Sequence, residues 1–363
     1  MATIANMCRD FCHKHDISAT SPPDLICVTR GPGMAGSLSS STEFAKGLSV
    51  AWNVPLVGVH HMLGHLLTSF LPQQSQQSQL PPPRFPFLSL LCSGGHTMLV
   101  LSKSISEHEI IINVSDIAVG DSLDKCAREL GMYGNMLGRE LESFIKNIPQ
   151  SEKEEFEAMN VDTRIGNKYK FRLTLPYQTP KNGKFNQDGI QFAFAQFLSN
   201  IQEYKKKFYV SDASNSGEFD AKTKRMIAYK TQEFVFDHII DRINLSLKMH
   251  GVRRQADGKF VGVQDFVCSG GVAANTRLRE KLFNNLNYEE LGQSPLRFHF
   301  PDLSLCTDNA IMIGLAGMEI FEKLKLKTDL SFTPLRKWPL NELTSVDSWV
   351  GVSDDEIDGV CKY

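Results

Sequence analysis

The chain has 363 residues, 42% of them hydrophobic, and a formal net charge of −2. A chain of this length can fold as two domains, each with its own core. The nearly balanced charge excludes a global basic field, so a polyanion would have to bind local patches. Basic runs at 205–207, 222–225 and 253–254 are candidates for such patches, although runs of this kind more often form a solvated face.

The eight cysteines are scattered and form no C-x-x-C pair. Several lie in apolar segments, where Cys behaves as a small buried hydrophobe. This usage fits a reducing compartment and argues against a secreted disulfide scaffold. No apolar run is long enough for a transmembrane helix, and the first residues show no signal or transit peptide.

The first part of the chain has the pattern of a βαβ unit. Residues 1–15 predict an amphipathic helix. An apolar strand is predicted at 24–29, a Gly-rich turn at 30–38, a helix through 44–48 and a second strand at 54–59. Strand, Gly turn, helix and strand in this order predict a parallel sheet.

Residues 72–83 are rich in Gln, Ser and Pro, which predicts a flexible loop and a domain boundary. Beyond this loop, the predicted elements are the two strands of a hairpin at 87–92 and 98–101, a strand at 110–114, a helix that starts within 116–125, a helix at 226–249, a strand at 264–268 and a helix at 310–324.

Three histidines fall within six residues at the end of the second predicted strand. His61 and His65 are spaced i, i+4, so on a helix both imidazoles lie on one face and can hold one metal ion. His60 points about 100° away from His61. The spacing is equally compatible with a plain pair of surface or core histidines. The stretch is similar to the H-E-x-x-H of metallopeptidases, but Met62 stands where that motif has its general base.

The tetrapeptide C-S-G-G occurs twice, at 92–95 and 268–271, each time after an apolar strand. Gly-Gly in this position lets a ligand approach the backbone and leaves N–H groups to face an anion. A helix after the second loop would add a partial positive charge. Together with the turn at 31–33, the matched loops predict a phosphate-bearing ligand held between two lobes.

Two aspartates have alternative explanations. Asp308 precedes a predicted helix, where Asp commonly serves as an N-cap. It could also be a third ligand beside His61 and His65, and a His/His/Asp set with open positions suits Zn²⁺ or Fe²⁺. Asp124 lies inside a predicted helix, where it is either a solvated residue paired with Lys125 or an acceptor for ribose hydroxyls or an amino group.

In this order and number, the motifs resemble those of the tRNA N6-adenosine threonylcarbamoyltransferase family, formerly named O-sialoglycoprotein endopeptidases. The matching segments are T-R-G-P-G at 29–33, G-S-L at 36–38, H-H-M-L-G-H at 60–65, S-G-G-H-T at 93–97, G-D-S-L-D-K at 120–125, G-G-V-A-A-N at 270–275, C-T-D-N at 306–309 and R-K-W-P-L at 336–340. The S-G-G-H-T form is similar to the bacterial and mitochondrial branch, because the other branch usually has Asn in place of His96.

The resemblance implies an α/β fold of the actin/Hsp70/sugar-kinase type, with two lobes and a nucleotide cleft between them. The first lobe would comprise 1–84 and 310–363, and the second 85–309. His61, His65 and Asp308 would hold one divalent ion per subunit, either Zn or Fe. The residues implied to bind the activated substrate are Cys92, Ser93, Gly94, Gly95, His96, Asp124, Gly134 and Asn275.

The implied reaction moves a threonylcarbamoyl group from threonylcarbamoyl-AMP, supplied by a separate synthase, to the N6 amine of the adenosine next to the anticodon in ANN-decoding tRNA. The resemblance also implies a mitochondrial enzyme and a homodimer, with no membrane partner. An adenine amine is a poor nucleophile, so the site must polarise the carbonyl and stabilise the departing phosphate. The catalytic acid or base is left unknown.

The sequence departs from the family pattern at three places. The family begins with a strand carrying E-T-S-x-D-D-T and a further histidine-bearing segment, and neither is in this sequence, so we expect a truncated first lobe or an incomplete enzyme. The family's F-S-F-S-G is replaced by F-A-F-A-Q at 192–196. Its P-G-G turn is reduced to Y-G-N at 133–135, which weakens the case for a ribose contact at Gly134.

Two rival hypotheses stay open at this point. One is a metal-dependent glycoprotein endopeptidase, against which Met62 argues. The other is a nucleotide-binding protein without catalysis, which the missing first strand allows.

Overall fold

The computed structural model describes residues 2–72, 80–161, 167–177, 190–210, 217–250, 259–286 and 296–360. The chain divides into two compact units, which we describe separately. The first comprises Met1–Phe87, Leu101–Ile110 and Pro301–Tyr363, and the second Leu88–Val100 and Ile111–Phe300. The domain boundaries expected from the sequence stay a prediction. The two compact units differ from them mainly because residues 101–110 and 301–309 belong to the first unit. Residues 253–254 and most of the loop predicted at 72–83 lie outside the described residues.

The first unit is built on the predicted βαβ element. Its elements are α1 (Ala2–Lys14), β1 (Ile26–Gly31), α2 (Ala35–Trp52), β2 (Leu56–His60), α3 (His61–Leu67), η1 (Thr68–Phe70), η6 (Leu303–Leu305), α10 (Ala310–Lys323), β9 (Leu326–Thr328), η7 (Leu340–Glu342), β10 (Trp349–Gly351) and α11 (Asp354–Val360).

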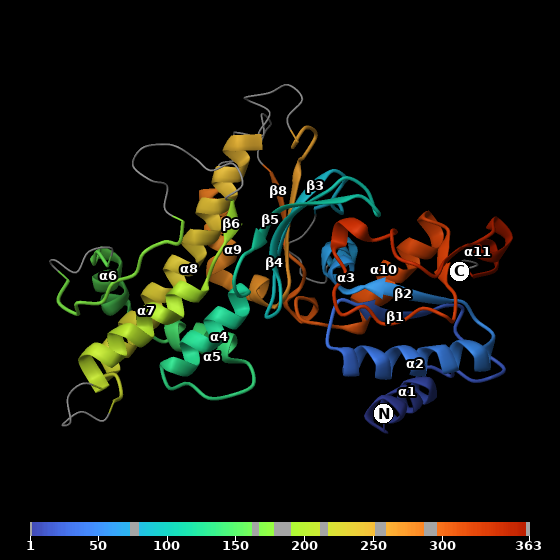
Figure 1. The fold of residues 1–363 in the computed structure, drawn as a ribbon, viewed down its shortest axis with the longest axis horizontal. Coiled ribbons are helices and arrows are strands. Elements are labelled where there is room, and N and C mark those ends of the chain that lie inside the picture. The colour runs from blue at the N-terminus through green and yellow to red at the C-terminus, as the bar shows by residue number, and fades with distance from the viewer. Residues whose placement is uncertain are drawn as a thin grey trace. The chain divides into compact units, whose positions relative to one another are not determined.

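Strands β1 and β2 pair in parallel, with Ile26 opposite Leu56, and α2 forms the crossover between them (Figure 1). Two neighbouring parallel strands need such a crossover, because a tight turn joins strands only in antiparallel orientation. All five residues of β2 are buried, as expected for a strand covered on both faces. Helices α2 and α10 both pack on this strand pair. The parallel sheet predicted from the first sixty residues is therefore confirmed.

Helix α1 forms where the sequence predicts it, but its apolar residues are not buried. None of its side chains is buried, and Met7 and Phe11 are 68% and 56% exposed. The apolar stripe of this helix therefore contributes nothing to the core of the first unit.

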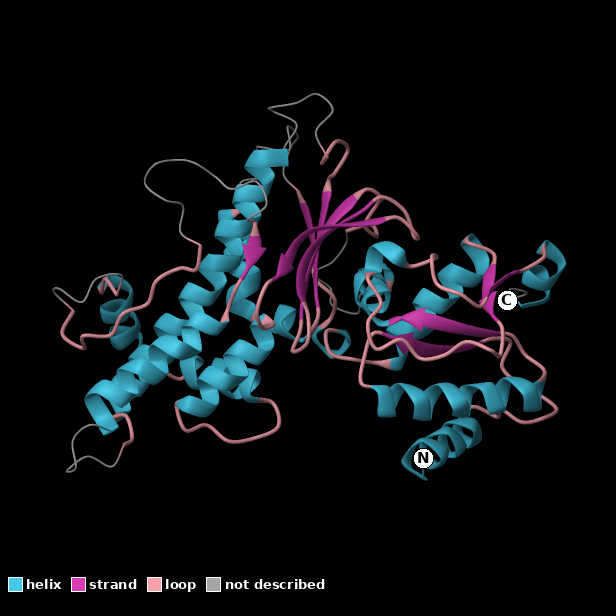
Figure 2. Ribbon diagram, viewed as in Figure 1, coloured by secondary structure: helices cyan, strands magenta, loops and turns pink. Residues whose placement is uncertain are grey.

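The second unit contains a six-stranded sheet with the strand order β6-β5-β4-β3-β7-β8. Strands are drawn as magenta arrows in Figure 2. Its strands are β3 (Phe87–Cys92), β4 (Thr97–Ser102), β5 (His108–Val114), β6 (Gln191–Phe192), β7 (Asp265–Ser269) and β8 (Arg297–His299). The outer end of β4 and the first residues of β5 are grouped with the first unit. Strands β3 and β4 are neighbours joined by a four-residue turn, which confirms the predicted hairpin.

The helical layer of the second unit is organised around the long helix α8 (Figure 1). The helices are α4 (Val119–Glu129), α5 (Leu137–Lys146), α6 (Gln150–Ala158), α7 (Ala195–Lys205), α8 (Ala221–His250) and α9 (Thr276–Asn285), with short turns η3 (Lys206–Val210) and η4 (Gly271–Ala274). Seventeen residues of α8 are buried, because the other helices pack along it. Among the described residues, no helix is long and apolar enough to cross a membrane.

Candidate metal site and glycine loops

A cluster of two histidines and one aspartate lies in the first unit. His61 and His65 project from one face of α3, and Asp308 immediately precedes the N-cap of α10. The Asp308 Oδ1 lies 3.1 Å from His65 Nε2 and 3.5 Å from His61 Nε2. The three ligand atoms all lie within 4.8 Å of one another. The i, i+4 spacing and the distant aspartate thus come together as expected.

The alternative role for Asp308, that of helix cap, falls to its neighbour. Asn309 is the N-cap of α10, and its Oδ1 accepts a hydrogen bond of 2.9 Å from the Met312 N–H. The Asp308 carboxylate is therefore not needed by the helix and faces the two imidazoles, with 76% of its side chain exposed.

The donor set fits a first-row divalent ion. Two atoms that each bind one ion at about 2.1 Å are roughly 3.0–3.4 Å apart at bond angles of 90–109°. The two carboxylate–imidazole separations, 3.1 and 3.5 Å, fall close to this range, whereas the imidazole–imidazole separation, up to 4.8 Å, would have to shorten around an ion. His65 is 1% exposed and His61 19%, so two ligands are held in protein while the third opens to solvent. Three protein ligands with an open side are typical of a catalytic rather than a structural ion.

His60, the third histidine of the stretch, has a structural role. Its Nδ1 accepts from the Met62 N–H at 3.1 Å, which caps α3, and its Nε2 donates to the Trp338 carbonyl at 2.8 Å. These two bonds fix the neutral tautomer with the proton on Nε2. Met62, which replaces the glutamate of a peptidase motif, is 2% exposed and packs in the core.

The Gly31-Pro32-Gly33 turn does not behave as a phosphate loop. A Cβ on Gly31 would lie 2.1 Å from the Leu335 carbonyl oxygen, so this glycine allows the C-terminal segment to lie directly on the turn. The Leu335 N–H donates to the Arg30 carbonyl at 2.8 Å, and the Gly33 N–H to the Arg336 carbonyl at 3.4 Å. The inclusion of this turn among the phosphate loops was therefore wrong, because the chain itself covers it.

The two C-S-G-G segments lie side by side in the second unit, at the ends of neighbouring strands β3 and β7. The Sγ atoms of Cys92 and Cys268 are 3.9 Å apart, and both side chains are fully buried. Gly270 has φ +98°, and a Cβ on it would lie 2.4 Å from the Cys92 carbonyl oxygen. The matched motifs thus form one packed pair, and the Cys92 side chain faces protein rather than a ligand.

The first glycine loop uses some of its own N–H groups. The Ser93 Oγ accepts from the N–H groups of Gly95 at 3.3 Å and His96 at 3.1 Å. The expectation that these groups point toward an anion is wrong for these two residues, because the serine side chain closes the turn. Gly94 and Gly95 are exposed, and a Cβ on either would contact nothing within 4 Å, so a ligand can approach this backbone closely.

Helix α4 is anchored on the same loop. The Gly120 N–H donates to the Ser93 carbonyl at 3.2 Å, and the Val119 N–H to the Thr97 Oγ1 at 2.9 Å. A Cβ on Gly120 would come within 2.9 Å of Ser93 and Gly94 backbone atoms. This close approach explains why the G-D-S-L-D-K motif begins with glycine. The two hydrogen bonds to Ser93 and Thr97 occupy the first N–H groups of α4.

Asp124 lies one turn further along α4 and caps α5. Its Oδ1 accepts from the Gly138 N–H at 2.6 Å. Burial raises the pKa of Asp124, and this hydrogen bond and the charge of Arg128 lower it in part. Gly134 lies in the exposed turn between the two helices, with φ +150°. Asp124 is therefore neither a plain solvated residue nor paired with Lys125, which binds Asp121 at 2.7 Å.

Asn275 caps the helix that follows the second glycine loop. Its Oδ1 accepts from the N–H groups of Arg277 and Leu278, and its Nδ2 donates to the Gln232 Oε1 at 3.1 Å. The Thr276 N–H donates to Glu142 at 3.1 Å. A helix N-terminus facing an anion was expected directly after Gly271. Instead, η4 follows Gly271, and the first N–H groups of α9 donate to the side chains of Asn275 and Glu142.

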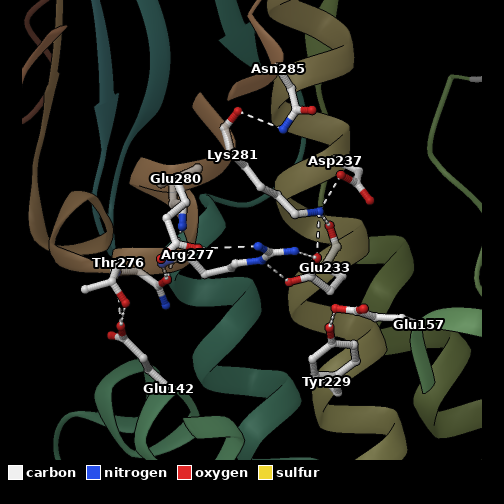
Figure 3. A network of polar contacts seen from close by, with 12 residues as sticks. Glu142, Glu157, Tyr229, Glu233, Asp237, Thr276, Arg277, Glu280, Lys281 and Asn285 are labelled. Atoms are coloured by element: carbon white, nitrogen blue, oxygen red, sulfur yellow. Dashed lines mark hydrogen bonds and ion pairs between the residues drawn. The ribbon is translucent and has the colours of Figure 1, made fainter. Parts of the chain in front are cut away.

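A network of charged side chains fastens α9 to α8 (Figure 3). Glu233 binds Arg277 through both oxygens at 2.8 Å and Lys281 at 2.8 Å, and Lys281 also binds Asp237. Although burial raises the pKa of Glu233, the hydrogen bond from Arg277 and the charge of Lys281 hold it below its usual value. The network positions the start of α9, next to its N-cap Asn275. Its partners lie about 44 positions apart, so no local spacing predicted it.

Comparison with known proteins gives the family. A family model described as tRNA N6-adenosine threonylcarbamoyltransferase (TsaD) matches residues 2–315. The chain is 34% identical over 329 residues to the mitochondrial tRNA N6-adenosine threonylcarbamoyltransferase of Schizosaccharomyces pombe, covering 90% of this chain and 69% of that protein. It is 29% identical over 344 residues to the tRNA N6-adenosine threonylcarbamoyltransferase of Nitrosomonas europaea, covering 94% of this chain and 84% of the relative.

Among solved structures, T. kodakarensis HypF aligns with a TM-score of 0.34 and 13% identity, over 81% of this chain and 40% of that chain. At this TM-score the likeness carries no argument.

The α/β units and the family match define a protein of the actin/Hsp70/sugar-kinase fold class, which confirms the predicted class. The chain belongs to the tRNA N6-adenosine threonylcarbamoyltransferase family, and the resemblance based on its motifs is confirmed.

Proposed function

We propose that this chain transfers the threonylcarbamoyl group of threonylcarbamoyl-AMP to the N6 amine of the adenosine next to the anticodon in ANN-decoding tRNA. Family membership across residues 2–315 supports the reaction class. The observation that carries the proposal for this chain is the His61, His65 and Asp308 cluster, which is complete and open on one side.

His61, His65 and Asp308 would hold one divalent ion, Zn²⁺ or Fe²⁺. When bound, the ion would supply a Lewis acid that polarises a carbonyl or holds phosphate oxygens. The protein's part is to fix the ligands. Burial of His65 and the packing of α3 on α10 restrict the imidazoles, while the exposed Asp308 leaves the open side of the cluster toward solvent.

The glycine loops of the second unit would bind the activated substrate through their backbone. Gly94, Gly95 and Gly271 have no neighbour within 4 Å of the position a Cβ would take, so a flat or charged group can lie against the main chain there. Ser93 and His96 would border that surface. Asp124 and Asn275 would act mainly by positioning α5 and α9, and Gly134 would lie at the rim.

The reaction depends on activation of the carbonyl and stabilisation of the leaving phosphate rather than on activation of the nucleophile. An adenine N6 amine is weakly nucleophilic, so attack on the carbamoyl carbon depends on a polarised carbonyl and a phosphate that departs easily. Such a site needs no general base beside His61, which is consistent with a buried Met62 at that position.

The partners and location follow from the same proposal. tRNA is the substrate that the family name gives, and a separate synthase would supply threonylcarbamoyl-AMP. We also propose a homodimer and a mitochondrial location. The mitochondrial relative from Schizosaccharomyces pombe supports the location, and imaging of a tagged full-length protein would test it.

The decisive experiment is reconstitution. The chain is incubated with a threonylcarbamoyl-AMP synthase, threonine, bicarbonate, ATP and an ANN-decoding tRNA, and the nucleosides are analysed by mass spectrometry. Formation of N6-threonylcarbamoyladenosine that depends on this chain is expected. If no product forms with the chain although the synthase makes threonylcarbamoyl-AMP, the proposed function is wrong for this chain.

A further inference from the structure

A polar hollow lies in the second unit, away from the glycine loops in sequence. It is a cavity of about 210 Å³ between the segment 167–177 and the helix α7 with its extension η3. The lining residues are Lys170, Arg172, Thr174, Asn200, Glu203, Tyr204, Lys207 and Phe208. Nothing in the proposed transfer reaction uses these residues.

One wall of the hollow is the stretch 170–174, in which buried and hollow-lining residues alternate. Phe171 and Leu173 are fully buried, whereas Lys170, Arg172 and Thr174 line the hollow. Lys170 has φ +53°, and its N–H closes a turn on the Asn167 carbonyl at 3.0 Å, so it stands at the start of this stretch. The alternation therefore leaves two cations and a hydroxyl on the side of this stretch that faces the hollow.

The other wall is one face of α7. Asn200 and Tyr204 are spaced i, i+4 on α7, and Lys207 follows in the π-helical segment η3. The two walls are fastened together, because the Tyr204 hydroxyl donates to the Tyr169 carbonyl at 2.6 Å and the Gln196 amide donates to the Thr174 Oγ1 at 2.6 Å. The stretch 170–174 is thus held at a fixed place beside the helix.

The two cations of the stretch 170–174 are not neutralised. Within the described part of the chain, Lys170 and Arg172 make no ion pair, whereas nearby Lys168 and Lys222 both bind Glu155. Glu203 is the single carboxylate of the lining, set against three cations. Among the described lining residues, cations therefore outnumber carboxylates, although the chain as a whole has a net charge of −2.

Asn200 adds a neutral donor that requires an acceptor. Its Nδ2 is buried and has no hydrogen-bond partner among the described residues. A buried amide N–H without an acceptor is destabilising, so native proteins rarely retain one without a use for it. An oxygen-rich anion in the hollow would satisfy this donor and meet Lys170 and Arg172 at once.

We propose that this hollow binds phosphodiester groups of the RNA substrate, an inference that rests on the proposed function. Lys170, Arg172 and Thr174 all line the hollow, so it offers two cations and a hydroxyl, which suit the phosphates of an RNA backbone. The aromatic residues do not serve as a stacking platform, because Lys207 lies 5.5 Å from the Phe208 ring centroid and the Tyr204 ring lies 5.0 Å from it. The contact is therefore to backbone phosphate and independent of base sequence.

The test is tRNA binding to the full chain by fluorescence anisotropy over a salt titration, without the transfer reaction. The double variant Lys170→Ala/Arg172→Ala should bind tRNA about tenfold more weakly, with the slope of log affinity against log salt reduced by about two. Asn200→Ala should weaken binding about threefold and leave the melting temperature unchanged or higher, because it removes an unsatisfied donor. A purely structural role for Asn200 would lower the melting temperature instead.

The matched control is Lys168→Ala/Lys222→Ala, which removes two cations already paired with Glu155 and should bind tRNA within about twofold of the parent. Equal losses in both double variants, or no loss in Lys170→Ala/Arg172→Ala, would overturn the inference. Displacement of tRNA by inorganic phosphate at constant ionic strength would reveal a small-anion site and would also overturn it. If the parent chain binds no tRNA, the proposed function itself fails.

Discussion

His65 and Asp308 are 243 positions apart in the chain, yet His65 Nε2 lies 3.1 Å from the Asp308 Oδ1. The contact exists because α3 packs on α10, so that the C-terminal end of one short helix meets the residue before another. The metal cluster is therefore a product of helix packing in the first unit, and its geometry depends on the neighbouring Asn309 doing the capping.

Replacement of either His61 or Asp308 should strongly reduce metal retention. We expect His61→Ala and Asp308→Ala each to lower the metal content after dialysis at least tenfold, measured by inductively coupled plasma mass spectrometry. His60→Ala is the matched control, because His60 caps α3 and binds Trp338 without joining the cluster. It should keep the ion and lose about 1–3 kcal/mol of unfolding free energy. Unchanged metal content in His61→Ala or in Asp308→Ala would refute the assignment of that residue as a ligand.

Much of the local fold could be predicted from the sequence. The βαβ unit, the β3–β4 hairpin and the long apolar helices have periodicities that tertiary packing did not override. The sequence analysis made no prediction for helix α5, whose Gly138 N–H is bound by Asp124, fourteen positions earlier in the chain. Strands β9 and β10 have three residues each, too few for an alternation to be recognised, and they form only by pairing with one another.

The residues of the metal cluster could be predicted from the sequence, but the contacts that each of them makes could not. Spacing put His61 and His65 on one helical face, and the choice between cap and ligand for Asp308 needed the position of Asn309. Arg30 shows the limit most clearly. It is fully buried and binds Asp347 at 2.6 Å, across 317 positions, and no local pattern records such a partner.

Alanine substitution should affect stability differently at a packed glycine, Gly270, and at an open one, Gly94. Gly270→Ala should cost about 2–5 kcal/mol of unfolding free energy, because a Cβ would lie 2.4 Å from the Cys92 carbonyl at φ +98°. Gly94→Ala meets open space and should change stability by no more than about 0.5 kcal/mol. If the loop binds substrate, Gly94→Ala should still weaken binding of a threonylcarbamoyl-AMP analogue about tenfold, measured by calorimetry. Unchanged binding would remove this loop from the site.

His238 should make the protein acid-sensitive. Burial, and to a lesser degree the charge of Arg242, lowers the pKa of His238 to about 4, and its Nε2 accepts from the Ala193 N–H at 3.1 Å, which requires the neutral ring. A histidine with a lowered native pKa stabilises the fold above its unfolded value of about 6.5, and that contribution is lost as the pH falls toward 4. Between pH 7 and pH 5 the loss from this residue should be about 2 kcal/mol, measured by urea denaturation.

The variant His238→Gln isolates this effect, because a glutamine oxygen can accept from Ala193 but does not titrate in this range. Its stability should fall less between pH 7 and pH 5 than that of the parent, by about 2 kcal/mol. Identical pH profiles for the two proteins would mean that His238 is not the group responsible.

The ion network between α8 and α9 should stabilise the second unit through Glu233. Arg277→Ala removes a two-point hydrogen bond from a carboxylate that is 12% exposed, but Lys281 stays in place to balance its charge. We therefore expect a loss of about 2 kcal/mol, less than for a buried charge left alone. Glu280→Ala removes the outer partner of the same arginine, which is 60% exposed, and should change stability by no more than about 0.5 kcal/mol. Denaturant unfolding of both variants checks this difference. A loss in Glu280→Ala as large as that in Arg277→Ala would show that the arginine stabilises the fold through its outer partner and not through Glu233.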